Sequence, residues 1–204
     1  MLFRSFSSYE AVPPDLWKKS QALFDCSVKI DAQRIAFYAQ EVQGLVVLNG
    51  VANNVLEAYN ELKEANAAVA MMNLWPSFIE LLKAEIAVPL EKHLPAITSF
   101  FESFNWPFEK VATRVGLVTP RVISMIINEA CYTVQEGTAG MKDIDLAMKL
   151  GTNYPFGPFE WANRIGIENV YACLEAIYLD TQEERYKICP LLKSHYLRQE
   201  AFPI

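Results

Sequence analysis

The chain has 204 residues, 52% of them hydrophobic, and its formal net charge is -6 at pH 7. This length suits one large domain or two small ones with a sizeable apolar core. The acidic balance excludes the basic surface of proteins that bind nucleic acid or anionic membranes. No apolar run approaches the ~18–20 residues that span a bilayer.

Glycine is scarce: the chain has 8, and only Gly44 and Gly50 precede position 116. Neither G-x-G-x-x-G nor G-x-x-x-x-G-K-[ST] occurs anywhere in the sequence. Both phosphate-binding loops need glycine for tight turns and for close approach of the backbone. The sequence therefore predicts no standard nucleotide-binding loop, and it assigns no cofactor-binding residue.

Apolar runs typical of strands recur through the first half of the chain. They are Ala22–Val28, Leu45–Leu48, Ala67–Met72, Leu81–Val88 and Phe108–Val115.

Signals for helix starts separate these runs. Asp31 can cap a helix that extends to Gln40, Asn54 and Glu57 form a capping-box pattern, and Pro95 suits a first helical turn. Strands that alternate with helices indicate βαβ units and a mostly parallel sheet.

The second half of the chain changes character and predicts helices alone. Apolar residues recur at helical spacing, and Gly151 is predicted to end the second helix as its C′ residue. The expected helices are centred on 123–134, 144–148, 170–178 and 191–198.

Cysteine and histidine show no metal-binding spacing, so no metal site is predicted. His93 and His195 are both expected at the surface. The N-terminus lacks a continuous apolar segment, which argues against a signal peptide. Two disulfides stay possible, but a chain this apolar does not need them, and we expect a cytoplasmic protein. The cysteines are Cys26, Cys131, Cys173 and Cys189.

A series of short motifs runs through the helical half in a fixed order. They are Gly116, Arg121, Asn128-Glu129-Ala130, Glu136-Gly137, Asp143-Ile144-Asp145, Ala147-Met148-Lys149-Leu150-Gly151, the G-P-F-E from Gly157, and Ile165-Gly166. This pattern resembles the C-terminal domain of the 3-hydroxyacyl-CoA dehydrogenases, an oxidoreductase family. In that family a Rossmann domain binds NAD, and a helical domain completes the active site and forms the dimer.

The resemblance implies an α/β domain followed by an all-α domain. Residues 1–114 would form an incomplete, degenerate Rossmann-like parallel sheet domain without the glycine loop. Residues 115–204 would form a helical domain of the 6-phosphogluconate-dehydrogenase C-terminal type, which makes a homodimer. Because 114 residues are short for two βαβαβ halves, we expect the pyrophosphate-binding half to be missing. NAD is thus a cofactor by resemblance only.

Three positions of the family's active site are changed in this sequence. Met72, in A-M-M-N-L-W-P, stands where the family has its general-base histidine, and a thioether cannot accept a proton near neutral pH. Val51 replaces a serine and Pro120 an asparagine, so hydrogen-bonding groups are lost. Glu85 matches the carboxylate that orients the histidine. It is the remaining catalytic candidate, the alternative being a strand residue that faces solvent or a basic neighbour.

A segment rich in proline and aromatic residues is the candidate for substrate binding or for the subunit interface. It could line an acyl pocket or form a dimer contact, or it could be only a structural corner between two helices. Glu129 could be a buried polar contact between domains or a solvated helix residue. The residues of the segment are Tyr154, Phe156, Gly157, Phe159 and Trp161.

Three functions stay open at this point. The first is a relative of these dehydrogenases in acyl-CoA metabolism that has lost hydride transfer and binds an acyl-CoA or a dehydrogenase partner subunit. The second is an active 3-hydroxyacyl-CoA dehydrogenase with a non-standard site, or with its cofactor half supplied by a partner. The third is a structural dimerisation module.

Overall fold

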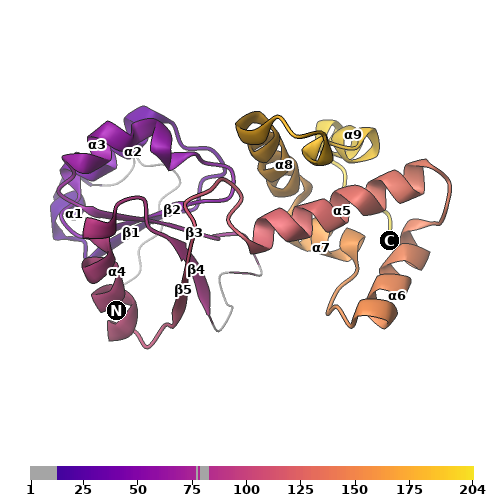
Figure 1. Ribbon diagram of the computed structural model, residues 1–204, viewed down its shortest axis with the longest axis horizontal. Coiled ribbons are helices and arrows are strands. Elements are labelled where there is room, and N and C mark those ends of the chain that lie inside the picture. The colour runs from indigo at the N-terminus through magenta and orange to yellow at the C-terminus, as the bar shows by residue number, and fades with distance from the viewer. Residues whose placement is uncertain (1–12, 77, 79–82) are drawn as a thin grey trace.

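The computed structural model describes residues 13–76, 78 and 83–204, and it places an α/β lobe beside a helical lobe (Figure 1). The α/β lobe is built on five strands. They are β1 (Ala22–Asp25), β2 (Leu45–Asn49), β3 (Ala68–Met72), β4 (Ala84–Ala87) and β5 (Phe108–Val111).

The strand order in the sheet follows the chain order, from β1 to β5. The first three strands are parallel, β4 is antiparallel to β3, and β5 is parallel to β4. The prediction of a mostly parallel sheet is confirmed. The first and last strands are shorter than predicted. Positions 81 and 82 of the predicted fourth strand lie outside the described residues.

Helices cover both faces of the sheet, α2 and α3 on one and α4 on the other (Figure 1). Alternate residues of β2 therefore enter two apolar layers: Val46 and Leu48 pack with the α2 side, and Leu45 and Val47 with the α4 side. The helical segments of this lobe are α1 (Pro14–Lys19), α2 (Ala32–Glu41), η2 (Val55–Ala58), α3 (Tyr59–Lys63), η3 (Glu91–His93) and α4 (Leu94–Ser103).

The predicted helix starts at Asp31 and Pro95 are confirmed, and the one at Asn54 differs from the predicted capping box. Asp31 caps α2 by accepting a hydrogen bond from the backbone N–H of Arg34 at 2.7 Å. Asn54 accepts from the N–H of Leu56 at 3.3 Å, but the segment that it caps begins as the 3-10 turn η2. Pro95 lies in the first turn of α4, as expected.

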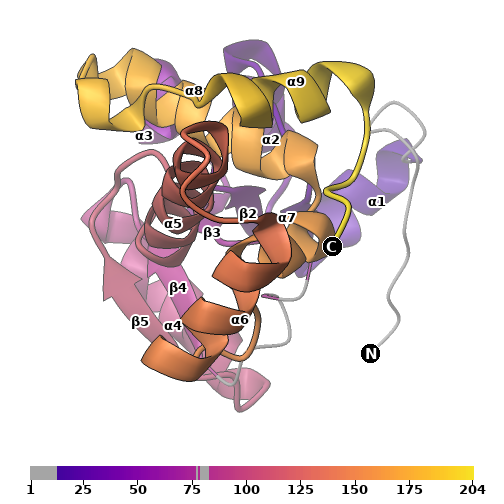
Figure 2. The same ribbon diagram turned by 90° about the vertical axis from the view of Figure 1, so that its right-hand side faces the viewer.

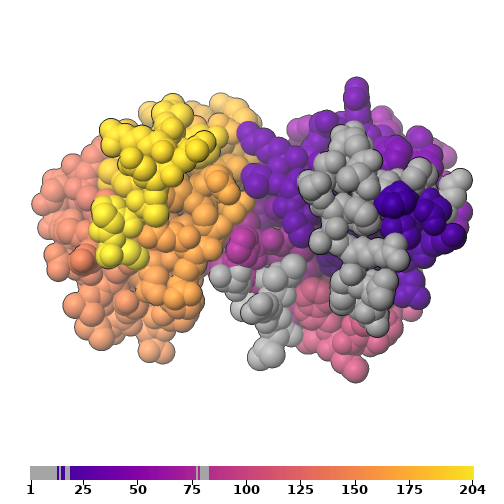
Figure 3. Space-filling model, turned by 180° about the vertical axis from the view of Figure 1, so that it is seen from behind, coloured from indigo at the N-terminus to yellow at the C-terminus, as the bar shows by residue number. Residues whose placement is uncertain are grey.

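The helical lobe is organised around α5, with α8 and α9 on one side and α6 and α7 on the other (Figures 1 and 2). Its buried cluster also includes Val51 and Trp75 from the α/β lobe. This apolar cluster therefore extends across the junction of the two lobes. Figure 3 shows them in contact from behind. The helical segments are α5 (Thr119–Gln135), α6 (Met141–Thr152), α7 (Pro158–Ile165), α8 (Ile167–Thr181), η4 (Glu184–Tyr186) and α9 (Pro190–Arg198).

The end of α6 differs from the prediction. Gly151 lies inside the helix, and the left-handed residue that ends it is Asn153, with φ 56°. Asparagine is the commonest substitute for glycine at this position, and the helix therefore continues past Gly151 to Thr152. The prediction that Gly151 is the C′ residue is wrong.

His93 is also placed differently from the prediction, because it is buried with 5% of its surface exposed. His93 is the last residue of η3, and its ring lies against β3. There its Nδ1 accepts a hydrogen bond from the N–H of Val69 at 3.2 Å. His195 lies on α9, and its ring is 4.4 Å from that of Phe202.

Candidate functional site

The altered active-site positions meet where β2 and β3 end. Met72 is the last residue of β3, and its carbonyl accepts a hydrogen bond from the N–H of Gly50 at 2.9 Å. Val51 follows Gly50 directly. The side chains of Val51 and Met72 are both buried, with 1% and 2% of their surface exposed. The structure thus brings these two positions together at one edge of the sheet, where β2 and β3 end, but their side chains pack in different apolar clusters, Val51 with the helical lobe and Met72 on the α4 side.

Glu85 lies at the same edge, because its neighbour Ile86 pairs with Met72 across β3 and β4. Its carboxylate accepts hydrogen bonds from the N–H of Thr119 at 3.0 and 3.1 Å and from that of Val118 at 3.3 Å. The hydroxyl of Thr119 donates to it as well. A carboxylate at a helix N-terminus satisfies unpaired N–H groups and complements the helix dipole. The partners of Glu85 are therefore the first turn of α5, not an imidazole or a basic side chain.

Pro120 follows in that first turn and is buried. The side chains at this edge therefore offer few groups for acid–base catalysis. The side chains of Val51, Met72 and Pro120 offer no proton acceptor at neutral pH, and the oxygens of Glu85 are occupied. In the part of the chain that the structure describes, neither histidine lies here, since His93 contacts β3 near its other end and His195 is on α9. The described residues at this edge therefore do not provide a general base.

The role of Glu85 leads to a prediction on stability. Glu85→Gln keeps one acceptor oxygen but removes the charge, so we expect the free energy of unfolding to fall by about 1–2 kcal/mol. Urea denaturation followed by circular dichroism measures it. Glu109→Gln is the matched control, because Glu109 pairs with Glu85 in the β4–β5 register but is exposed beside Lys83. The control should change nothing measurable, and an equal loss in both variants would contradict the assignment.

The loop after β1 is held by a buried polar network. The Asp25 carboxylate accepts hydrogen bonds from the Tyr38 hydroxyl at 2.8 Å and the Ser27 N–H at 2.9 Å, and it pairs with Arg34 at 2.8 Å. Burial raises the pKa of Tyr38, which keeps this hydroxyl protonated as the donor. Asn53 accepts from the N–H of Ile30 at 2.7 Å. The loop's polar groups are thus bonded within the protein.

A cleft of about 490 Å³ lies between this loop, the segment after β2 and helix α8. One ammonium lines it against three carboxylates. Lys29 pairs with Glu175 across the lobes at 2.8 Å, which raises the pKa of Lys29. Asp180 pairs with the guanidinium of Arg114 at 3.0 Å, and Glu57 is the third carboxylate of the lining. A phosphate in this cleft would have to compete with Glu175 for Lys29, the one cationic side chain among the described residues of its lining.

The residues do not fit NAD. Dinucleotides bind open α/β sheets where the strand order reverses, and the described sheet runs from β1 to β5 with no reversal. The first turn of α2, which follows β1, already holds the Asp31 carboxylate where an anion would sit. The glycine loop is also missing, and Glu175 already pairs with the one lining ammonium of the cleft. The described residues therefore leave no cradle for a pyrophosphate.

The aromatic segment spans the turn between α6 and α7 and the first residues of α7. Phe159 is fully buried, with its ring edge-to-face against Phe202 at 4.9 Å, and Trp161 is 8% exposed. These two side chains belong to the core of the helical lobe, which favours the structural-corner interpretation for them. Tyr154 and Phe156 are half-buried, the first 5.1 Å from Trp161 and the second 4.0 Å from the guanidinium of Arg164.

Gly157 is required by a residue that sequence reasoning missed. A Cβ on Gly157 would lie 2.3–2.4 Å from atoms of Asp145. The buried Asp145 carboxylate caps α7, accepting from the N–H of Phe159 at 2.8 Å and from that of Glu160 at 3.0 Å. The sequence identified Asp145 only as part of the Asp143-Ile144-Asp145 motif. Its position on the inward face of a predicted helix was the feature that could have indicated a buried, hydrogen-bonded carboxylate.

Glu129 is exposed on α5, so it is not a buried contact between the lobes. Its role at an interface stays a prediction. Within the described ranges, no three His, Cys, Asp or Glu side chains are grouped so that they could hold a metal ion. None of the described helices has the length and apolarity to cross a membrane.

Comparison with known proteins points to one family. Residues 116–201 match the model described as 3-hydroxyacyl-CoA dehydrogenase, C-terminal domain. The chain is 39% identical over 93 residues to 3-hydroxyadipyl-CoA dehydrogenase of Escherichia coli (strain K12), covering 46% of this chain and 20% of that protein. It is 26% identical over 170 residues to 3-hydroxybutyryl-CoA dehydrogenase of Clostridioides difficile, covering 82% and 60%. The chain thus spans less than two thirds of the length of these curated relatives.

Solved structures agree on the fold. FadB2 of M. tuberculosis superposes with a TM-score of 0.75 at 17% identity, covering 91% of this chain and 68% of that one. The (S)-3-hydroxybutyryl-CoA dehydrogenase PaaH1 from Ralstonia eutropha gives the same TM-score and coverage at 20% identity. The prediction of a Rossmann-like domain followed by a helical domain is confirmed.

Proposed function

Because this chain belongs to the 3-hydroxyacyl-CoA dehydrogenase family, we propose that it serves acyl-CoA metabolism as a partner subunit and performs no NAD-dependent hydride transfer of its own. The relatives are named for hydroxyacyl-CoA substrates, which supports this class of compound as the substrate of the proposed assembly. The four cysteines are free thiols, which fits a reducing compartment, and we place the protein in the cytoplasm.

One observation carries the proposal. Met72 is buried at the position that the resemblance gives to the general base, and the carboxylate that would orient this base binds the first turn of α5. Hydride transfer to or from a hydroxyl carbon needs a group that moves the hydroxyl proton. Among the residues that the structure describes, this edge offers none.

We further propose that the helical lobe contacts a second copy of the chain. Val118, Val122 and Glu129 recur along one exposed stripe of α5, where Val118 is 50% and Val122 51% exposed. On α6, Leu146 is 55% and Leu150 78% exposed. Large exposed apolar side chains mark interaction sites. The stripe on α5 is the expected centre of a homodimer, and the exposed leucines of α6 are candidates for its periphery.

The test follows NADH absorbance with acetoacetyl-CoA. We expect no turnover above a no-enzyme blank, with the Clostridioides difficile relative as the active control. Turnover would overturn the proposal and favour an active enzyme with a non-standard site. Calorimetry with acetoacetyl-CoA then tests the subunit role. We expect no heat from the chain alone, and saturable binding would replace the partner-subunit role with an acyl-CoA-binding role.

Light scattering measures the assembly in the same samples. We expect twice the 23.1 kDa chain mass, and Val122→Glu should shift the mass to that of one chain. Leu197→Glu is the control, since Leu197 is 68% exposed on α9, away from the stripe. A wild-type mass of 23.1 kDa would refute the homodimer.

A further inference from the structure

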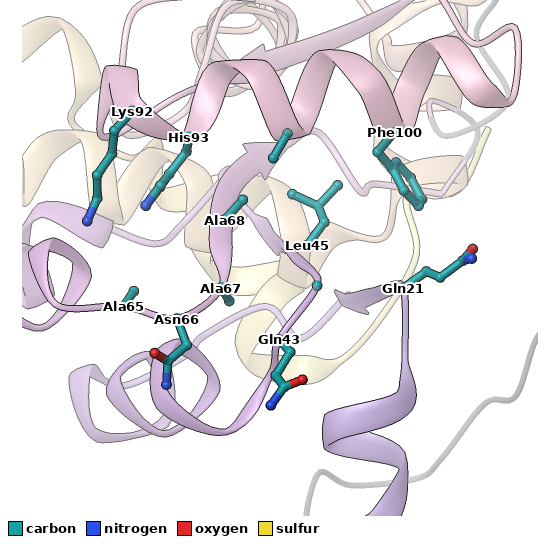
Figure 4. A pocket seen from close by; sticks show the side chains of 12 residues that line it. Gln21, Gln43, Leu45, Ala65, Asn66, Ala67, Ala68, Lys92, His93 and Phe100 are labelled. Atoms are coloured by element: carbon teal, nitrogen blue, oxygen red, sulfur yellow. The ribbon is translucent and has the colours of Figure 1, made fainter.

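A second cavity lies at the opposite edge of the sheet from Met72, where β2 and β3 begin. Its volume is about 390 Å³. Figure 4 shows the side chains of Lys92 and His93 extending from η3 toward the segment 65–67. Leu45 follows along the cavity, and Phe100 lines its far end from α4. Nothing in the proposed function uses this cavity.

His93 brings an unpaired donor to the wall of this cavity. Its Nδ1 accepts the hydrogen bond from the N–H of Val69, so the proton of the neutral ring is on Nε2. That Nε2 is buried and has no hydrogen-bond partner in the structure. Burial and the charge of Lys92 lower the pKa of His93, which keeps the ring neutral at neutral pH. Buried donors are nearly always hydrogen-bonded. We therefore expect the Nε2–H group of His93 to donate to an acceptor on a bound molecule.

The lining of the cavity also carries one positive charge. Lys92 is the one charged side chain among the described residues that line it. Its ammonium donates to the carbonyl of Lys63, at the last residue of α3, and this uses one of its three donors. The remaining wall is alanine, Leu45, Phe100 and neutral amides. An occupant should therefore combine a negatively charged acceptor group with a small apolar body.

We propose that this cavity binds a small carboxylate with an apolar body. The carboxylate oxygens accept hydrogen bonds from Nε2 of His93 and Nζ of Lys92, and the apolar body lies against Leu45 and Phe100. The site is separate from the altered active-site edge, so it stands whether or not the chain transfers hydride.

The experiment titrates the full chain with benzoate and observes ¹H–¹⁵N spectra of the backbone and of the imidazoles. We expect saturable shifts of the Val69 amide and of His93 Nε2 in the millimolar range typical of so small a ligand. Benzamide, the neutral isostere, should bind at least about tenfold more weakly, and benzylamine should not bind. Lys92→Gln should weaken benzoate binding by about tenfold.

A blocking variant separates this site from others. Ala96 is exposed on α4 and lines the cavity, so Ala96→Trp should fill it and abolish the shifts while leaving the fold intact by circular dichroism. Ser99→Trp, one turn further along α4 and outside the lining, is the matched control and should bind as the wild type does. Absence of saturation, equal binding of the three ligands, or unchanged binding in Ala96→Trp would each overturn the proposal.

Discussion

Gly157→Ala should destabilise the helical lobe by about 3 kcal/mol, because the added methyl group has no space. The new Cβ would lie 2.3 Å from Cγ and 2.4 Å from Cβ and Oδ1 of Asp145. Asp145 cannot move aside without releasing the N–H groups of Phe159 and Glu160, which its carboxylate caps at the start of α7. Either outcome, overpacking or a lost cap, costs free energy of folding.

Gly151→Ala is the matched control with the opposite sign. Gly151 lies within α6, and an added Cβ would meet nothing within 4 Å. Replacing a helical glycine with alanine stabilises by up to about 1 kcal/mol. Urea denaturation, with m-values compared, measures both variants. A change below about 0.5 kcal/mol for Gly157→Ala would contradict the packing argument.

A double-mutant cycle checks the mechanism. Asp145→Ala alone should destabilise by about 1–3 kcal/mol, because two buried N–H groups lose their acceptor. In the double variant the added methyl at position 157 no longer meets a carboxylate, so its extra cost should largely vanish. Additive losses would show that Gly157 is constrained by something other than Asp145.

The strands were the most predictable part of the fold. Leu45–Leu48 and Ala67–Met72 are apolar on both faces, and only a strand covered on both sides accommodates that pattern. The Asp31 cap was also local information. The end of α6 could not be predicted from Gly151 alone. The helix ends at the residue that adopts the left-handed conformation, and this residue is Asn153, two positions after Gly151.

The site was predictable in composition but not in contacts. The resemblance identified Met72 and Glu85, yet the partner of Glu85 is Thr119, 34 residues away. Only the sheet register and the placement of α5 bring these two together. The burial of His93 was missed for a related reason. Two adjacent polar residues such as Lys92 and His93 predict a surface position for both. In the 3-10 turn η3, however, Lys92 is exposed and His93 is buried, and the N–H of Val69 donates a hydrogen bond to one ring nitrogen of His93.

Trp75→Ala is the other substitution with a large expected effect, because Trp75 joins the two lobes. It is the largest of the fully buried side chains, with 1% exposed, and it follows β3 yet belongs to the core cluster of the helical lobe. Truncating a buried tryptophan costs about 3–5 kcal/mol. We expect this loss, and we also expect the lobes to uncouple, since the cavity opens in the core that they share.

Calorimetry distinguishes uncoupling from simple destabilisation. A two-state protein has equal calorimetric and van't Hoff enthalpies, and Trp75→Ala should break that equality and expose the segment 112–118 to protease before global unfolding. Phe101→Ala is the control of similar cost, because Phe101 is fully buried in the cluster under α4, away from the junction. Its cleavage should follow global unfolding alone. If both variants unfold in one transition with the same protease sensitivity, the lobes are held together by contacts other than Trp75, and the Glu85 bonds to α5 become the principal connection between them.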